Sequence, residues 1–167
     1  MIQLQPLAAD TRALRTLFSY FPSGVVAVCS VIDGEPVGMA ASSFTSVSLD
    51  PALVSFCVQN TSETWPRLRT PPRIGVSVLA ENHEDQCLQL SKKTGDRFAS
   101  VEWNRTTEGC VLINDAAVWL DCSIRDEIAA GDHTIVVLDI HGIEGSADIA
   151  PLLFHQSRFR KIVAIAG

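Results

Sequence analysis

Two stretches of the sequence combine residue types that suit a flat, phosphorylated ligand. The first, Gly38 to Phe44, brings small residues and hydroxyls to the end of a predicted strand. Small side chains let a flat molecule approach the backbone, so that main-chain N–H and C=O groups can bond its polar edge. The second, Val58 to Thr64, is a polar run between a predicted buried strand and a predicted helix. A helix N-terminus with free N–H groups is a ready phosphate site, although an ordinary helix cap is the simpler interpretation of spacing alone.

The sequence lacks the motifs of serine hydrolases and of metal sites. No serine stands in a G-x-S-x-G motif, and Ser91-Lys92-Lys93 does not make an S-x-x-K motif. The 4 histidines are widely spaced, and none pairs with a second His at a helical separation. The patterns therefore argue against a serine hydrolase and predict no metal site.

The composition describes an apolar, weakly charged, acidic chain. Of 167 residues, 47% are hydrophobic and 19% are charged, and the formal net charge is −6. Such a chain can bury a full core, which excludes intrinsic disorder, and we expect a single domain over residues 1–167 with a flexible N-terminus at 1–9. The acidic balance argues against nucleic acid or an anionic membrane as partner. The low charge also suggests that a second subunit or a flat ligand covers part of the surface.

Cysteine usage and the N-terminus bear on the compartment. The 5 cysteines are scattered without a C-x-x-C pair, which is typical of buried thiols in a reducing cytosol. The first ten residues lack a signal-peptide pattern, and no segment approaches the roughly 20 apolar residues of a membrane span. We therefore expect a cytoplasmic protein with no membrane partner.

Three helices are expected. The first has an apolar stripe at helical spacing, formed by Leu14, Leu17, Phe18 and Phe21. Asp10 or Thr11 can cap it, and Pro22-Ser23-Gly24 ends it. A short second helix is predicted over Thr61 to Arg69, with Thr61 or Ser62 as its cap, and a third is predicted from a cap at Asn82 to about Ser91.

The remaining regular segments are predicted strands. Asp33-Gly34 is a strong hairpin signal between two of them, and Ala129 to Asp132 forms a turn between two others. The strands are expected at residues 25–32, 36–41, 53–58, 73–79, 117–128 and 133–143. In the fifth of these, Val118, Leu120, Cys122 and Ile124 share one face. Strand–helix alternation is poor and no G-x-G-x-x-G motif is present, so a Rossmann domain is disfavoured. The pattern predicts a mainly β fold: a closed or nearly closed antiparallel β-barrel with peripheral helices.

Five pieces of sequence, in order along nearly the whole chain, resemble the flavin reductase-like family. They are residues 21–25, 38–51, 96–99, 131–133 and 151–155. The resemblance implies the FMN-binding split barrel, a Greek-key-like antiparallel barrel. It also implies an NAD(P)H-dependent flavin reductase, with FMN or FAD as flavin and NADH or NADPH as co-substrate.

The resemblance also implies roles for individual residues. The flavin ring and ribityl chain are expected against Met39, Ala40, Ala41, Ser42 and Ser43. The flavin phosphate is expected at Cys57, Val58, Gln59, Asn60, Ser62 and Thr64, with Arg97 and Phe98 near the cofactor's polar end. Phe159 is also an expected cofactor contact. It stands where the family often has Tyr, and Ser157 where Gly is common, so a hydroxyl role there is in doubt.

His133 is the one candidate catalytic residue. By resemblance it opens a strand beside the flavin, where the nicotinamide would stack. The alternative is a turn histidine that hydrogen-bonds to nearby backbone. Hydride transfer from nicotinamide C4 to flavin N5 needs no side-chain nucleophile, because the cofactors supply the reactivity.

Two functions of different class follow. The first is a homodimeric flavin reductase that supplies reduced flavin to a separate monooxygenase. The alternative is a flavin-binding electron carrier or binding module without nicotinamide turnover of its own. A purely structural protein is least favoured, because it leaves the two polar stretches without purpose.

Overall fold

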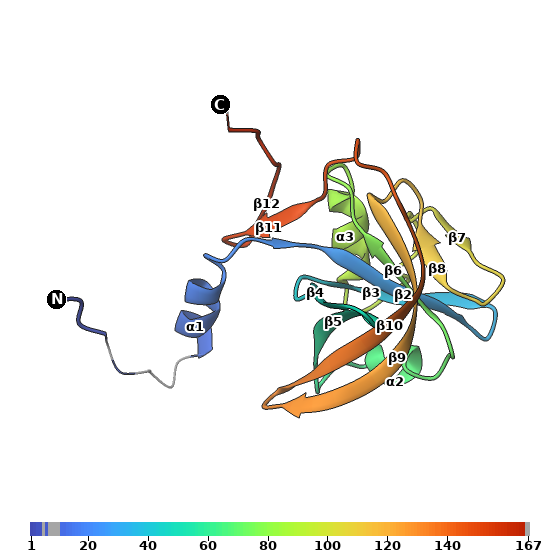
Figure 1. The fold of residues 1–167 in the computed structure, drawn as a ribbon, viewed down its shortest axis with the longest axis horizontal. Helices are drawn as coiled ribbons and strands as arrows, with labels where there is room; N and C mark the ends of the chain where they lie inside the picture. The colour runs from blue at the N-terminus through green and yellow to red at the C-terminus, as the bar shows by residue number, and fades with distance from the viewer. Residues whose placement is uncertain (5, 7–10, 166–167) are drawn as a thin grey trace.

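A seven-stranded antiparallel sheet curls into a barrel in the computed structural model, which describes residues 1–4, 6 and 11–165 (Figure 1). The strands follow the order β3-β2-β6-β9-β10-β5-β4. Their bounds are β2 Val26–Ile32, β3 Glu35–Ala41, β4 Thr45–Leu49, β5 Ala52–Gln59, β6 Ile74–Val78, β9 Val118–Ala130 and β10 His133–Gly145. The predicted antiparallel barrel is confirmed.

Smaller elements surround the barrel. The helices are α1 Thr11–Phe18, α2 Trp65–Leu68 and α3 Glu84–Leu90. The short strands are β1 Ser23–Gly24, β7 Trp103–Arg105, β8 Val111–Ile113, β11 Leu153–His155 and β12 Arg158–Arg160. Strands β1, β11 and β12 make one small sheet and β7 and β8 another, and α1 stands apart from the barrel beside the first of these (Figure 1).

The barrel is open along one line. β3 and β5 approach one another but are not hydrogen-bonded neighbours in the strand order. The Ser43 hydroxyl bridges this gap, because it accepts the Cys57 N–H at 2.8 Å and donates to the Cys57 carbonyl at 3.1 Å. Unpaired strand edges leave main-chain donors and acceptors available here.

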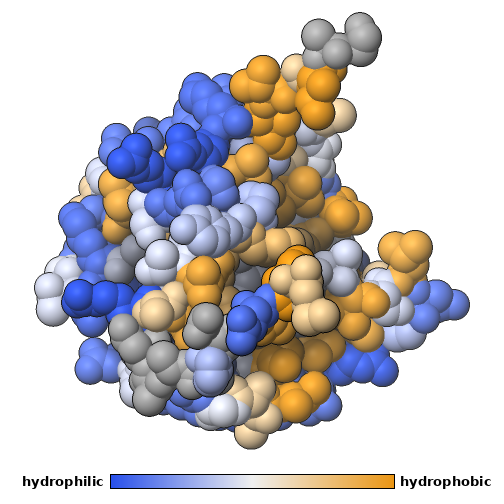
Figure 2. Space-filling model, turned by 90° about the vertical axis from the view of Figure 1, so that its left-hand side faces the viewer, coloured by the Kyte–Doolittle hydropathy of each residue, from blue (hydrophilic) through white to orange (hydrophobic). Residues whose placement is uncertain are grey.

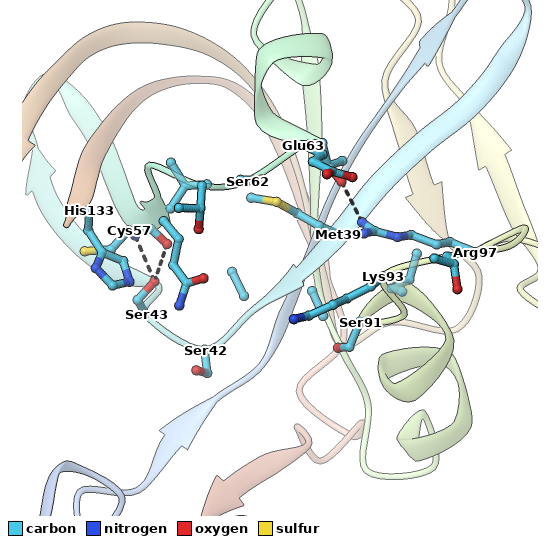
Figure 3. A pocket seen from close by; sticks show the side chains of 18 residues that line it. Met39, Ser42, Ser43, Cys57, Ser62, Glu63, Ser91, Lys93, Arg97 and His133 are labelled. Carbon is cyan, nitrogen blue, oxygen red and sulfur yellow. Dashed lines mark hydrogen bonds between the residues drawn. The ribbon is translucent and has the colours of Figure 1, made fainter. Parts of the chain in front are cut away.

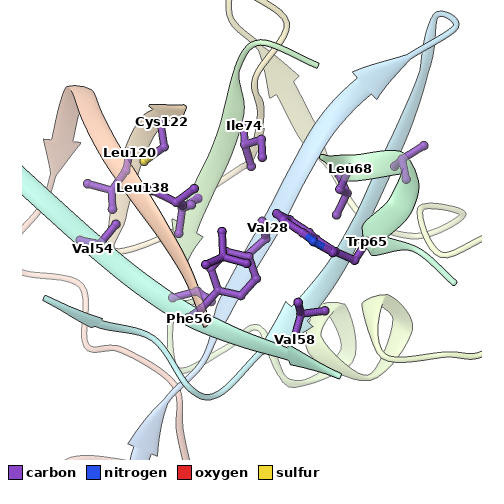
Figure 4. Close-up of a cluster of buried hydrophobic side chains, with 14 residues drawn as sticks. Val28, Val54, Phe56, Val58, Trp65, Leu68, Ile74, Leu120, Cys122 and Leu138 are labelled. Atoms are coloured by element: carbon purple, nitrogen blue, oxygen red, sulfur yellow. The ribbon is translucent and has the colours of Figure 1, made fainter. Parts of the chain in front are cut away.

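Two apolar clusters hold the strands in place. One fills the barrel, where the Phe56 and Trp65 rings meet edge to face at 5.5 Å (Figure 4). Leu120 and Cys122 belong to this cluster, and Val118 and Ile124 pack against it, which confirms the predicted apolar face. The second cluster lies outside the barrel wall and includes Cys29, Leu90, Phe98 and Leu152.

The second predicted helix is wrong in its bounds. α2 covers only Trp65–Leu68. Ser62 folds into a preceding turn, since its N–H donates to the Gln59 carbonyl at 2.9 Å. Its hydroxyl accepts the Trp65 N–H at 3.1 Å, so Ser62 supports the helix start without belonging to the helix, and Thr61 is no cap.

The other helices also differ from expectation. α3 begins at Glu84 with His83 before it, so Asn82 is not its cap. α1 ends at Phe18, before Pro22-Ser23-Gly24, and none of its residues is buried. The proposed Asp10 cap and part of the expected flexible N-terminus, residues 5 and 7–9, lie outside the described residues; residues 1–4 and 6 belong to no helix or strand. Within the described part of the chain, no helix has the length and apolar character needed to cross a membrane.

The thiols follow the prediction with one exception. All five cysteines are free, and four are buried, while Cys57 is half-buried. Burial raises the pKa of Cys29, Cys110 and Cys122 to about 12 in each case.

Candidate functional site

A cavity of about 730 Å³ opens where β3 and β5 part. One wall comes from the end of β3 and the small residues after it, and the other comes from β5 and the segment leading to α2. Twelve predicted site residues line it: Met39, Ala40, Ala41, Ser42, Ser43, Cys57, Val58, Gln59, Ser62, Thr64, Arg97 and His133. The structure therefore brings together both polar stretches and the single candidate catalytic residue.

Asn60 is not among the lining residues. Its side-chain amide donates to the Gly131 carbonyl at 3.1 Å and accepts from the Thr134 hydroxyl at 2.9 Å, and its N–H donates to the Asp132 carbonyl at 3.0 Å. These bonds tie the end of β5 to the turn that precedes His133. Asn60 thus positions a cavity residue.

Phe98 and Phe159 are not among the lining residues either. Phe98 is buried in the outer cluster, and its ring packs so close to Gly38 that a Cβ there would collide with it. Phe98 therefore supports the back of β3. Phe159 packs edge to face on Phe154 at 5.5 Å, in the same cluster.

Six further lining residues are not among the individually predicted site residues, although two of them belong to the polar run from Val58 to Thr64. They are Thr61, Glu63, Leu90, Ser91, Lys93 and Thr94. Leu90 is the last residue of α3, and Ser91, Lys93 and Thr94 follow it directly. The sequence shows a polar run after a predicted helix, but no local sequence pattern indicates that this run folds back towards β3.

One end of the cavity is cationic. Figure 3 shows Lys93 and Arg97 on one side, with Ser43, Cys57 and His133 on the opposite side. Arg97 Nη1 donates to the Thr64 hydroxyl at 2.8 Å and to the Gly38 carbonyl at 3.0 Å, so the guanidinium is held in place. A fixed guanidinium with a lysine nearby is suited to a phosphate.

The helix-terminus contribution to anion binding is smaller than predicted. α2 has 4 residues, the Trp65 N–H is taken by Ser62, and Pro66 has no N–H. Glu63 also lines the cavity and adds a negative charge. Anion binding at this end would therefore depend on the side chains of Lys93 and Arg97 more than on helix amides.

His133 lies at the other end, at the start of β10. Its Nδ1 meets the Asp132 carboxylate at 2.8 Å, and the side chain is 36% exposed. The hydrogen bond and charge of His133 lower the pKa of Asp132. Because the carboxylate engages Nδ1, Nε2 is the ring nitrogen that a ligand could meet. His133 therefore contacts an acidic side chain, whereas the alternative of a turn histidine predicts a hydrogen bond to nearby backbone.

The residues present fit a flat ligand with an anionic tail. The volume is in the range of small-molecule sites. Small residues on the β3 wall admit a ring close to the backbone, and the two cations stand at one end. Among residues 1–4, 6 and 11–165, no group of His, Cys, Asp or Glu could hold a metal ion.

Comparison with known proteins agrees with this geometry. The family profile "Flavin reductase like domain" matches residues 18–163. A probable flavin reductase of Rhizobium meliloti is 39% identical over 82% of this chain, but the match spans only 44% of that protein's length. The reductase subunit HsaB of a flavin-dependent monooxygenase from Rhodococcus jostii is 31% identical over 93% of this chain and 80% of its own.

A solved structure extends the likeness to the fold. The NADH:FAD oxidoreductase SgcE6 of Streptomyces globisporus, in complex with NAD and FAD fragments, superposes with a TM-score of 0.90 at 34% identity, covering 98% of this chain and 100% of that one. With a profile match over most of its length and relatives above 30% identity, the chain belongs to the flavin reductase-like domain family.

Proposed function

We propose that this protein is an NAD(P)H:flavin oxidoreductase that supplies reduced flavin to a separate monooxygenase. The observation that carries the proposal is the cavity at the open line of the barrel, with fixed Arg97 at one end and His133 at the other. Family membership supports it, and so does the likeness to proteins named as flavin reductases and as a monooxygenase reductase subunit.

The chain's own residues would bind and orient the ligands. Bound flavin and nicotinamide would supply the hydride chemistry. Main-chain groups of Met39 to Ser43 would bond the flavin ring edge, and Lys93 and Arg97 would hold its phosphate. His133, oriented by Asp132, would present Nε2 beside the reacting rings and donate or accept a hydrogen bond there. The half-enclosed cavity would exclude part of the water.

The second candidate function is a flavin-binding electron carrier without nicotinamide turnover. Purified protein with FMN or FAD, mixed with NADH or NADPH nearly without oxygen, separates the two. The reductase predicts rapid loss of the oxidised-flavin absorbance with at least one donor. No catalysed loss with either donor would leave only the carrier. The same steady-state series decides FMN against FAD and NADH against NADPH.

We also propose that the chain acts as one cytoplasmic domain and pairs with a second copy. The support for pairing is the apolar side of α1 and of the turn after it, where Leu17, Phe18 and Phe21 are 61%, 71% and 79% exposed. Apolar groups gather on the face of the molecule that carries this helix (Figure 2). Soluble proteins cover such patches with a partner.

A further inference from the structure

A second cavity, of about 340 Å³, lies between α1 and the turn that joins β11 to β12. α1 and the residues just after it contribute Arg12, Arg15, Thr16, Ser19 and Tyr20, and the turn contributes Gln156 and Ser157. The Gln156 N–H donates to the Ser19 carbonyl at 2.8 Å and joins the two walls. We call this cavity the α1 cleft.

α1 leaves most of its apolar stripe outside the core. Amphipathic helices usually turn this stripe towards their own core. Here Leu17 and Phe18 stay exposed and Leu14 is half-buried. The polar side of the helix forms one wall of the cleft, through Arg12, Arg15, Thr16 and Ser19 at i, i+3, i+4 and i+7.

The opposite wall uses side chains at positions that favour glycine. Gln156 and Ser157 have φ angles of 50° and 58°, in the left-handed region that side chains rarely adopt. A two-residue hairpin turn of this kind usually carries Asn-Gly. Both side chains line the cleft, and a glycine at 157 would remove a hydroxyl from it.

The charged side chains that the described residues bring to the cleft have one sign. Both are arginines, and within residues 11–165 no carboxylate is among the lining residues. This contrasts with the net charge of −6 of the whole chain. Arginines with Tyr, Gln and Ser donors nearby are the usual composition of a phosphate site.

The cleft also lies towards the His133 end of the first cavity. Figure 1 shows α1 and the tip of the β9–β10 hairpin, where β10 begins at His133, on the same side of the molecule. The hydrogen bond from His133 is the main cause of the lowered pKa of Asp132, and the charge of Arg15 adds to it. Asp132 in turn contacts His133, which lines the first cavity. A ligand whose ring lies beside His133 could thus extend its anionic part towards the arginines.

We infer that the α1 cleft binds a phosphate group of the nicotinamide dinucleotide while its nicotinamide lies beside His133. This inference rests on the proposed reductase function and adds the subsite that holds the co-substrate. The phosphate could be the pyrophosphate shared by NADH and NADPH or the 2′-phosphate of NADPH alone, and the experiment separates these sources.

The test compares Arg15→Glu and Arg12→Ala with the control Arg105→Glu, an exposed arginine on β7. Flavin-loaded protein is assayed with NADH, NADPH and reduced nicotinamide riboside, which has no phosphate. We expect Arg15→Glu to raise the KM for the dinucleotide about 10-fold or more with kcat within about twofold, and to leave the KM for the riboside unchanged. Equal rises for NADH and NADPH assign the pyrophosphate, and a larger rise for NADPH assigns the 2′-phosphate.

Two results would overturn the inference. One is an unchanged dinucleotide KM in both cleft variants, and the other is an equal rise for riboside and dinucleotide. A matching effect of Arg105→Glu would also reject it, as a general charge effect. Equilibrium binding of NAD⁺ to the flavin-loaded protein compares the same variants without turnover. Absence of reductase activity would reject the proposed function, and the Kd for NAD⁺ would still test the cleft. Thermal unfolding confirms that each variant is folded.

Discussion

The Ser43 hydroxyl makes two hydrogen bonds across the open line of the barrel, both to the backbone of Cys57. Ser43→Leu removes both bonds and places a larger side chain in the cavity wall. The two bonds, each worth about 1 kcal/mol, hold the two cavity walls together, and the leucine takes up space beside the small residues of β3. The Kd for flavin is therefore expected to rise about 10-fold or more. Flavin fluorescence quenching measures the Kd. Ser100→Leu, at an exposed position that does not line the cavity, is the matched control; equal affinity in both variants would contradict the assigned site.

The proposed role of Arg97 in holding the flavin phosphate can be tested by comparing ligands with and without that phosphate. In Arg97→Met the guanidinium is lost, while much of the side-chain bulk remains. If Arg97 pairs with the phosphate, the Kd for FMN should rise about 10- to 100-fold, as expected for a charge-assisted bond. The Kd for riboflavin, which lacks the phosphate, should change much less. A parallel loss for both ligands would show that Arg97 acts only through its bonds to Thr64 and Gly38.

The thiols differ in how readily they form thiolates. Burial raises the pKa of Cys29, Cys110 and Cys122 to about 12, and burial also raises the pKa of Cys87. Since only the thiolate is nucleophilic, a raised pKa means less reaction at a given pH, and near pH 8 about one in ten thousand of the three most shifted thiols is ionised. We expect iodoacetamide at that pH to label the folded protein once, at Cys57, by mass spectrometry. Labelling of the buried thiols at the same rate would contradict the packed core, and unfolded protein, which should take up five labels, is the control.

At the scale of elements, the β11–β12 turn carries a conformational cost. Ser157 has a φ of 58°, which a glycine adopts without penalty. Ser157→Gly should therefore raise the free energy of unfolding by roughly 1 kcal/mol, measured by urea denaturation. Gly34→Ala, at a φ of +86° in the β2–β3 turn, is the reciprocal control and should lower it by a similar amount. A loss of stability in Ser157→Gly would mean that the serine side chain contributes more than the strain costs.

The elements also show where sequence reasoning succeeds. Strands with strong apolar runs, such as β2 and β5, were predicted close to their observed bounds, because burial imposes a pattern that is local in sequence. The four-residue α2 and the strands of two or three residues carry too little pattern of their own and exist through tertiary contacts. Asp33-Gly34 predicted its hairpin correctly because a turn of that kind needs two positive φ angles.

The candidate site also contains residues with a local sequence signal and residues that only tertiary contacts bring to the cavity. Residues that leave a strand end, such as Ser42 and Ser43, were found because the strand itself was found. Lys93 was missed, since it reaches the cavity only when α3 folds against β3. Asn60, Phe98 and Phe159 are predicted cofactor contacts that are not among the lining residues, a distinction that depends on which way each side chain points.

At the scale of the whole molecule, the low charge has a structural counterpart in α1. Leu17 and Phe18 of the predicted apolar stripe lie on this helix and Phe21 follows it, and all three are exposed outside the core. Each such side chain that a partner buries contributes roughly 1.5–3 kcal/mol to the free energy of association. A second copy offers the same stripe, so a symmetric pairing of helices would cover both at once.

This pairing gives the last prediction. Wild-type protein should elute with a mass of about 36 kDa by light scattering, twice the 18.1 kDa of one chain. Leu17→Glu with Phe18→Glu should shift it to the monomer, because each buried carboxylate would lose its hydration. The helix makes no buried contact with its own barrel, so the variant monomer should remain folded by circular dichroism. Leu88→Glu, at an exposed apolar position on α3, should stay dimeric. A wild-type monomer would reject the pairing, and a dimer that survives both α1 substitutions would place the interface on another face.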